Sequence, residues 1–225
     1  MVNSVTFIHT ITRYHNMQRR WGKENLHTIR WLHSLTVCRI ERMALAQARR
    51  LLRCSPEILD MNPARMWIDR LQLTRHPEGG WFRETYRSMD HLAPSALAAR
   101  FDSERSLATS IYYLLEAPDF SSLHRIRSDE LWYFHAGSTL LLHLIDPAGT
   151  YQLRRIGLDE QAEPQALAPA GWLFGASLAE PAGWCLVSCL VAPGFDFRDF
   201  ELPTRATLLQ QFPSHARLIE GLTRL

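Results

Sequence analysis

Short apolar segments separated by regularly spaced turn signals constrain the fold of this chain more than any other feature of its sequence. From Met61 onward, turn-forming residues recur about every 8–15 residues, as in Pro77-Glu-Gly-Gly80, Pro169-Ala-Gly171 and Pro193-Gly194. Apolar segments of this length between turns are typical of many short strands packed as a β-sandwich or a β-barrel. The pattern therefore predicts an all-β domain.

The same pattern predicts the individual elements. A short helix is expected at 66–71, before the strands, and two more at 204–212 and 216–222, after them. The predicted strands are 81–87, 108–115, 122–126, 130–136, 139–145, 151–156, 165–168, 172–178 and 184–191. The expected fold class is all-β with a few short flanking helices.

Residues 1–60 differ from the rest of the chain. They carry ten of the 25 basic residues and four of the 23 acidic ones. Three interpretations remain open: an arginine-rich leader, a basic arm that contacts a partner, or a translated upstream stretch whose true start is Met61 or Met43. The last is favoured because the recognisable domain begins just after Met61. We expect 1–60 to be a basic N-terminal extension, either disordered or a mis-assigned start, and 61–225 to be the folded domain.

Composition excludes several classes of protein. No run of about 18 apolar residues exists, so a membrane-spanning helix is not expected. A net charge of +2 argues against a nucleic-acid partner. Four cysteines in 225 residues are too few for a disulfide framework, which favours a reducing, cytoplasmic location. Cys185 and Cys189 are expected on one buried face of a strand.

One segment carries a chemical signal. Around the predicted turn at Ser128-Asp129, His124 and Ile126 share one strand face, and Glu130, Trp132 and Phe134 share the facing one. A histidine and a carboxyl group would then converge on one interior surface. Such a pair is suited to general acid–base catalysis, or it is a buried pair that only satisfies its own hydrogen bonds.

The spacing from His124 through Ile126 and Glu130 to Gly137 resembles the first cupin motif, His-x-His-x(3–4)-Glu-x(6)-Gly. Pro169-Ala-Gly171-Trp-Leu-Phe174 resembles the second, Pro-x-Gly-x(2)-His. Three further blocks look like the signatures of one family of small single-domain cupins of unknown function: 76–87, 128–137 and 191–201. The resemblance runs from about Met61 to the C-terminus. It implies a cupin jelly-roll barrel (a double-stranded β-helix), a small-molecule pocket at its open end and a homodimer.

The chain departs from metal-binding cupins, which use three histidines and one glutamate. His124 and Glu130 are kept, but Ile126 and Phe174 stand at the other two ligand positions. Apolar side chains cannot coordinate a cation, which normally needs three or four protein ligands. We therefore expect no metal cofactor; a metal, if bound, would use His124 and Glu130. His135 falls on the opposite strand face, and His143 is the candidate replacement ligand.

The resemblance also extends to metal-free relatives. Sugar-nucleotide epimerases related to dTDP-4-dehydrorhamnose 3,5-epimerase use this barrel with a histidine base and a tyrosine acid. This implies His124 as base, Tyr86 or Tyr112 as acid, and Glu130 as a group that orients His124 or has a raised pKa. Arg83 would contact an anionic ligand. The remaining expected ligand contacts are Trp132, Phe134, Phe174 and His143.

Three functions follow from these expectations. The first is binding of a small polar or anionic metabolite with isomerase or epimerase chemistry. The second is binding or sensing without catalysis. The third is a metal-dependent, dioxygenase-like cupin enzyme whose missing ligands come from elsewhere. The enzyme interpretation needs an acid and a base facing one cavity, whereas the metal interpretation needs a further ligand beside His124 and Glu130.

Overall fold

The computed structural model describes residues 62–224 of the chain. The expected extension at 1–60 lies outside the described residues. The elements are α3 (Pro63–Leu71), β1 (Thr74–Arg75), β2 (Trp81–Arg87), β3 (His91–Leu92), η3 (Pro94–Ala96), β4 (Arg105–Ser106), β5 (Thr109–Glu116), β6 (Ser121–His124), β7 (Asp129–Gly137), β8 (Leu140–Ile145), β9 (Tyr151–Ile156), β10 (Gln165–Ala168), β11 (Leu173–Leu178), β12 (Trp184–Ala192), η4 (Phe197–Asp199), α4 (Arg205–Gln211), η5 (Pro213–His215) and α5 (Ala216–Gly221).

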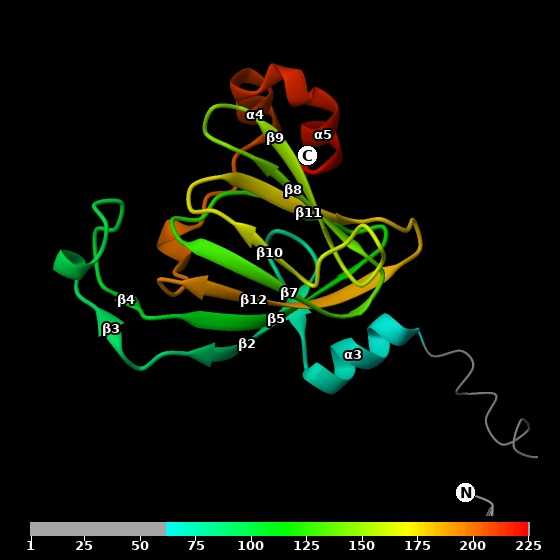
Figure 1. Cartoon of the computed structure of the whole chain (residues 1–225), viewed down its shortest axis with the longest axis horizontal. Coiled ribbons are helices and arrows are strands. Elements are labelled where there is room, and N and C mark those ends of the chain that lie inside the picture. Colours follow the sequence, from blue (N-terminus) through cyan, green and yellow to red (C-terminus); the bar gives the residue numbers. More distant parts are fainter. Residues whose placement is uncertain (1–61, 225) are drawn as a thin grey trace, which may run out of the picture. The chain divides into compact units, whose positions relative to one another are not determined.

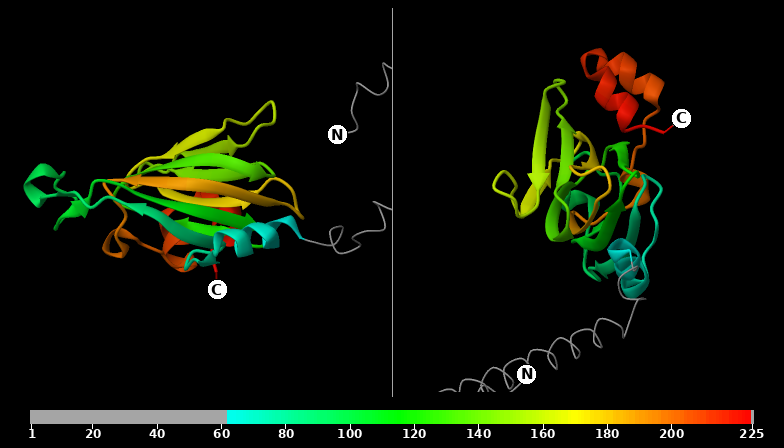
Figure 2. Two further views of the ribbon diagram at one scale, coloured as in Figure 1. Left: turned by 90° about the horizontal axis from the view of Figure 1, so that it is seen from below. Right: turned by 90° about the vertical axis from the view of Figure 1, so that its right-hand side faces the viewer.

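Two antiparallel sheets face each other across the core (Figures 1 and 2). The larger sheet has the order β1-β2-β5-β12-β7-β10 and the smaller one β6-β11-β8-β9. The chain crosses between the sheets at nearly every connection from β5 to β12, so strands that are consecutive in sequence face each other. This is the jelly-roll arrangement, and the predicted all-β fold with short flanking helices is confirmed.

Strand alternation explains the core. Side chains of one parity on each strand point between the sheets, such as Leu140, Leu142 and Leu144 of β8, all at most 1% exposed. On β12 the inward positions include Cys185 and Cys189, which are buried on one face as predicted.

Helices cover the outer faces of both sheets. Leu208, Phe212 and Ile219 of the C-terminal helical segment pack on the outer side of the smaller sheet, against Leu123 and Ile145 (Figure 1). Helix α3 packs on the larger sheet through Ala64 and Ile68. Among residues 62–224, none of the helices combines the length and the apolar character needed to cross a bilayer.

The connection between β2 and β5 projects from one end of the barrel as an arm (Figure 1). Its two short strands, β3 and β4, pair only with each other. The base of the arm is fixed by a fully buried ion pair. Nε and Nη2 of Arg105 each lie 2.7 Å from the carboxylate oxygens of Asp199 in η4.

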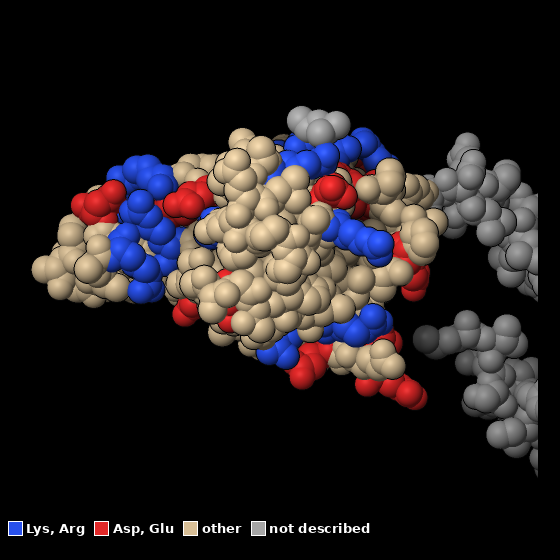
Figure 3. Space-filling model, turned by 90° about the horizontal axis from the view of Figure 1, so that it is seen from above, with Lys and Arg blue, Asp and Glu red and all other residues tan. Residues whose placement is uncertain are grey.

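Charges on the described surface are mixed. On the face seen from above, arginine side chains lie next to aspartate and glutamate side chains (Figure 3). Ion pairs on the described surface include Arg155 with Asp159 and Arg198 with Asp196. The mixture agrees with the small net charge of the sequence.

Candidate functional site

A cavity of about 80 Å³ lies between the two sheets. That is several times the space that one water molecule needs. About half of its lining side chains are apolar, and seven of the fifteen are titratable. The lining residues are His76, Glu78, Phe82, Glu84, Arg87, Thr109, Ile111, His124, Ile126, Glu130, Cys189, Val191, Phe195, Phe197 and Phe200.

An irregularity in β6 positions the central histidine. Ser121 and His124 are three residues apart, yet both point inward because the register between β6 and β11 shifts at this point. Gly175 of β11 makes room for the shift, since a Cβ there would lie 2.7 Å from the Ser121 carbonyl oxygen. The same shift brings the Ser122 carbonyl within 2.7 Å of Nδ1 of His124.

A turn between β1 and β2 supplies the partner of His124. His76 and Glu78 lie in this turn, and Gly79 adopts φ +118°, which is accessible only to glycine. A side chain at Gly79 would also collide with the Phe120 carbonyl. Tyr113 Oη donates to the Gly79 carbonyl at 2.9 Å, and Asp119 accepts from the Gly80 N–H at 2.9 Å. The turn is therefore fixed with the Glu78 carboxyl facing inward.

Hydrogen bonding shows that one proton lies between His124 and Glu78. Nδ1 of His124 must carry a hydrogen because its partner, the Ser122 carbonyl, is only an acceptor. Nε2 lies 3.1 Å from Oε2 of Glu78, and two lone pairs would repel at this distance. Either Glu78 is protonated and donates, or His124 is protonated and donates. Ser121 Oγ donates to the other carboxyl oxygen at 2.9 Å.

Burial favours the neutral form of this pair. The His124 side chain is 3% exposed and that of Glu78 is 7% exposed. Removal from water lowers the pKa of His124 to about 4 and raises the pKa of Glu78. We therefore assign the proton to Glu78, which donates to Nε2 of a neutral imidazole.

Glu130 is a second neutral acid in the same cavity. Burial raises its pKa to about 8. The Cys189 thiol lines the same cavity. His76 completes the set; its ring lies edge-on to Phe82, with centroids 4.5 Å apart, and burial lowers its pKa.

The strand pattern predicts that His124 and Glu130 face one interior surface, and the structure places both on the same cavity. The two predicted tyrosine acids do not reach it. Tyr86 is 54% exposed, and Tyr112 lies on the outer face with its ring against His135. The reason is strand alternation: the inward residue of β5 at this level is Tyr113, which is fully buried.

Arg83 also points away from the cavity. Its guanidinium lies 6.0 Å from the ring of Tyr112 on the outer face. A register irregularity between Glu84 and Tyr86 turns Arg87 inward instead. Arg87 is held by Glu84 at 2.6 Å and donates to the Phe195 carbonyl at 3.1 Å.

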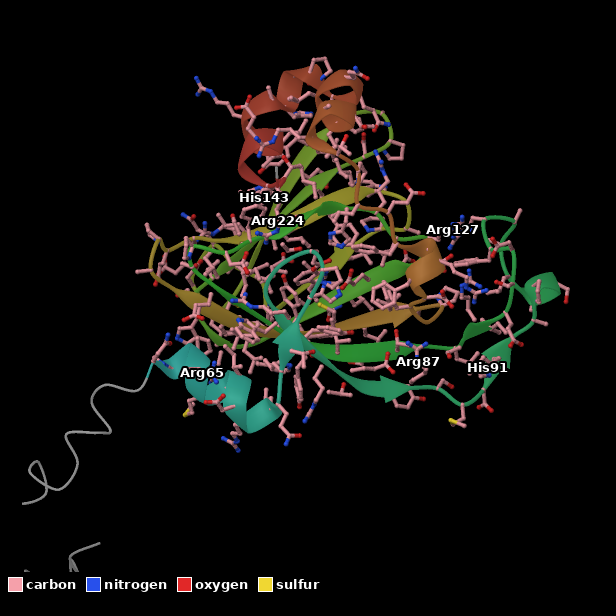
Figure 4. All side chains as sticks on the ribbon, turned by 180° about the vertical axis from the view of Figure 1, so that it is seen from behind. Arg65, Arg87, His91, Arg127, His143 and Arg224 are labelled. Atoms are coloured by element: carbon pink, nitrogen blue, oxygen red, sulfur yellow. The ribbon has the colours of Figure 1, made fainter. Side chains whose placement is uncertain are left out.

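The other four predicted ligand contacts do not line the cavity. Trp132 and Phe174 are buried within it, and Phe134 packs against it; none lines the cavity. Phe174 instead supports His124, with ring centroids 4.2 Å apart. His143 points to the opposite side of β8, where it bonds Tyr151 Oη and Ser177 Oγ. Figure 4 shows it near the C-terminal helices and far from Arg87.

Sequence reasoning missed His76 and Glu78 as members of the site. The Gly79-Gly80 pair predicts a tight turn, and a turn is present. The signal that could have found the site is Glu78, a carboxylate directly before Gly79. The positive φ of Gly79 fixes the path of the chain at this turn. Spacing alone does not show that this turn folds back onto β6.

The residues do not fit the metal centre that the cupin resemblance implies. Ile126 and Phe174 stand at two ligand positions, and both nitrogens of His124 are engaged by Ser122 and Glu78. His143, on the far face, cannot replace them. Within residues 62–224, no cluster of three histidine, cysteine or acidic side chains has a geometry suited to a metal ion.

Comparison with known proteins decides the family. Residues 65–203 match the family described as "Cupin superfamily (DUF985)". The chain belongs to this cupin family. A cupin of Shewanella oneidensis, protein SO0799, is 40% identical with a TM-score of 0.66, over 73% of this chain and 99% of that one. A hypothetical protein from Leishmania major is 37% identical with the same TM-score, over 73% and 100% of the chains. The uncharacterised protein YML079W of Saccharomyces cerevisiae is 30% identical, over 59% of this chain and 71% of its own length.

Proposed function

We propose that this cupin binds a small, uncharged carbonyl compound in the barrel cavity and moves a proton at the carbon next to the carbonyl. This is isomerase or epimerase chemistry without a metal. The observation that carries the proposal is the His124–Glu78 pair, which holds one proton beside the cavity. Glu130, a neutral acid near pH 7, faces the same cavity.

The proton balance of this reaction is simple. Glu78 passes its proton to Nε2 of His124, and its carboxylate takes the α-proton of the substrate, so that the pair becomes positively charged. Glu130 donates its proton to the carbonyl oxygen, so that an enol forms and Glu130 becomes a carboxylate. The two opposite charges attract each other in the low-dielectric cavity. Return of the protons gives the isomerised product and restores both groups.

The electrostatics of the cavity favour an uncharged reacting group. Glu78, Glu84 and Glu130 face one cationic side chain, Arg87, which is already paired with Glu84. An anion in the cavity would therefore lack a free cation. A polar but uncharged ligand agrees better with this set than the anionic one expected from Arg83.

A second candidate is ligand binding without catalysis. Both nitrogens of His124 and both carboxyl oxygens of Glu78 already have protein partners. A pair whose hydrogen bonds are all satisfied within the protein can shape the cavity and contact a ligand without transferring a proton to it. The two candidates share the cavity and differ in proton exchange.

Deuterium exchange distinguishes them. The purified chain is incubated in D2O with a panel of unphosphorylated keto- and aldo-sugars of three to six carbons, and NMR follows the α-proton signals. We expect exchange with at least one sugar. His124→Asn and Glu130→Gln should each slow it about 100-fold or more, the usual contribution of an acid or base.

The matched control is His135→Gln, because His135 lies on the outer face and bonds Ser188. It should exchange at the wild-type rate. A thermal shift with a sugar that shows no exchange would support the binding function instead. Neither binding nor exchange with any sugar of the panel would contradict the proposal.

A further inference from the structure

A second groove, of about 350 Å³, lies behind the cavity wall that carries His124. It runs between β6 and the segment before α4, next to the last described residues. Its lining residues are Ser122, Leu123, Leu202, Pro203, Thr204, Arg205, Ala206, Thr223 and Arg224. Figure 4 shows Arg224 between the C-terminal helices and the barrel.

A buried hydroxyl without a partner lines this groove. Ser122 is 3% exposed, and its Oγ makes no hydrogen bond within the described residues. Leaving a buried hydroxyl unpaired destabilises the fold, because the group loses its hydrogen bonds to water and gains none in return. Neighbouring Ser121 shows the usual outcome, since its Oγ donates to Glu78. The Ser122 hydroxyl is therefore an unpaired donor, and an oxygen atom of a ligand in the groove would supply its missing acceptor.

Among the described residues, two arginines line the groove and no carboxylate does. Arg205 uses Nε and Nη2 to hold Thr223 and the Glu220 carbonyl. Arg224 uses Nη2 to hold Asp119 and the Phe120 carbonyl. Within residues 62–224, Nη1 of both arginines makes no hydrogen bond, so each guanidinium has donors left for an anion.

We propose that this groove binds a small oxyanion, a phosphate ion or the phosphate group of a metabolite. Arg205 and Arg224 supply the charge, and Ser122 supplies a hydroxyl donor. The Ser122 carbonyl holds Nδ1 of His124 at 2.7 Å. Binding at the hydroxyl of the same residue is therefore transmitted to the imidazole in the cavity. The proposal does not depend on the reaction proposed for the cavity.

Phosphate titration of the full chain tests the site. Inorganic phosphate and glycerol 2-phosphate are titrated at constant ionic strength, and binding is followed by calorimetry. We expect saturable binding of one phosphate group per chain. Ser122→Ala should weaken it about tenfold, the usual effect of losing one hydrogen bond to a charged group. Arg205→Gln should weaken it at least as much.

The control is Arg217→Gln, an exposed arginine of α5 that lines a different surface depression. It should bind phosphate as the wild type does. Ser122→Ala removes an unpaired hydroxyl, so its melting temperature should not fall. Tighter binding of glycerol 2-phosphate than of phosphate would identify a phosphorylated metabolite as the ligand; equal binding would identify the free ion.

Unchanged phosphate affinity in both Ser122→Ala and Arg205→Gln would overturn the site. The coupling has its own readout, because phosphate should shift the NMR signal of the His124 Nδ1 proton. Saturable binding without this shift would overturn the link to the cavity and leave the groove as an isolated anion site.

Discussion

Asp199→Ala is expected to destabilise the folded chain by about 3–5 kcal/mol. Asp199 is 3% exposed and forms two hydrogen bonds of 2.7 Å with Arg105, itself 2% exposed. Removing the carboxylate leaves a buried guanidinium whose remaining charge partner is the exposed Asp102, 3.4 Å from Nη2, which costs far more than the net value of the pair. The change also releases η4, which carries Phe197 next to the cavity.

Urea denaturation measures this effect, and Asp196→Ala is the matched control. Asp196 lies three residues away and pairs with the exposed Arg198, so its loss should cost at most about 1 kcal/mol. Replacing both buried partners, as Arg105→Met with Asp199→Leu, should cost less than Asp199→Ala alone. Equal losses in Asp199→Ala and Asp196→Ala would contradict the buried-pair account.

Glu130→Gln is expected to stabilise the protein increasingly as the pH rises from 4.5 to 8. The pKa of Glu130 is about 8 in the folded chain and 4.5 in its ordinary environment. Between these pH values the folded state keeps a proton that the unfolded state loses, so wild-type stability falls as the pH rises through this window. Glutamine cannot ionise and lacks this loss. The difference in the free energy of unfolding should grow by a few kcal/mol from pH 4.5 to pH 8.

Unfolding curves at a series of pH values check the sign. Below pH 4.5 the variant and the wild type should differ little from this cause, because Glu130 is protonated in both states. Glu104→Gln is the control, since Glu104 is exposed and should show no such trend. A difference that is constant between pH 4.5 and 8 would show that Glu130 ionises normally in the fold.

Strand positions were predictable from this sequence because turns and alternation are local. The predicted strands 81–87, 151–156 and 165–168 agree with the observed bounds, and most others differ by one or two residues. Strands β1, β3 and β4 were not predicted. Each has two residues, which is too short to show alternation: β1 pairs across the turn with β2, and β3 pairs with β4.

The site was predictable only in part. Alternation alone brings His124 and Glu130 to one cavity, and the metal-ligand positions follow from the motif. The register shifts in β2 and β6 do not follow from alternation. The shift in β2 makes Arg83 and Arg87, which have the same parity, point to different faces, and the shift in β6 makes Ser121 and His124 both point inward. Glu78 reaches His124 through a turn whose direction depends on Phe120 and Asp119. The homodimer and the cytoplasmic location stay predictions.

The most direct test of the account is the protonation state of His124, measured by ¹⁵N NMR of the labelled chain across pH. We expect a neutral imidazole with its proton on Nδ1 that becomes charged only near pH 4. Glu78→Gln should keep this tautomer, because its amide also donates to Nε2. A His124 that titrates near pH 6.5, or a neutral one with its proton on Nε2, would contradict the shared-proton pair on which the proposed function rests.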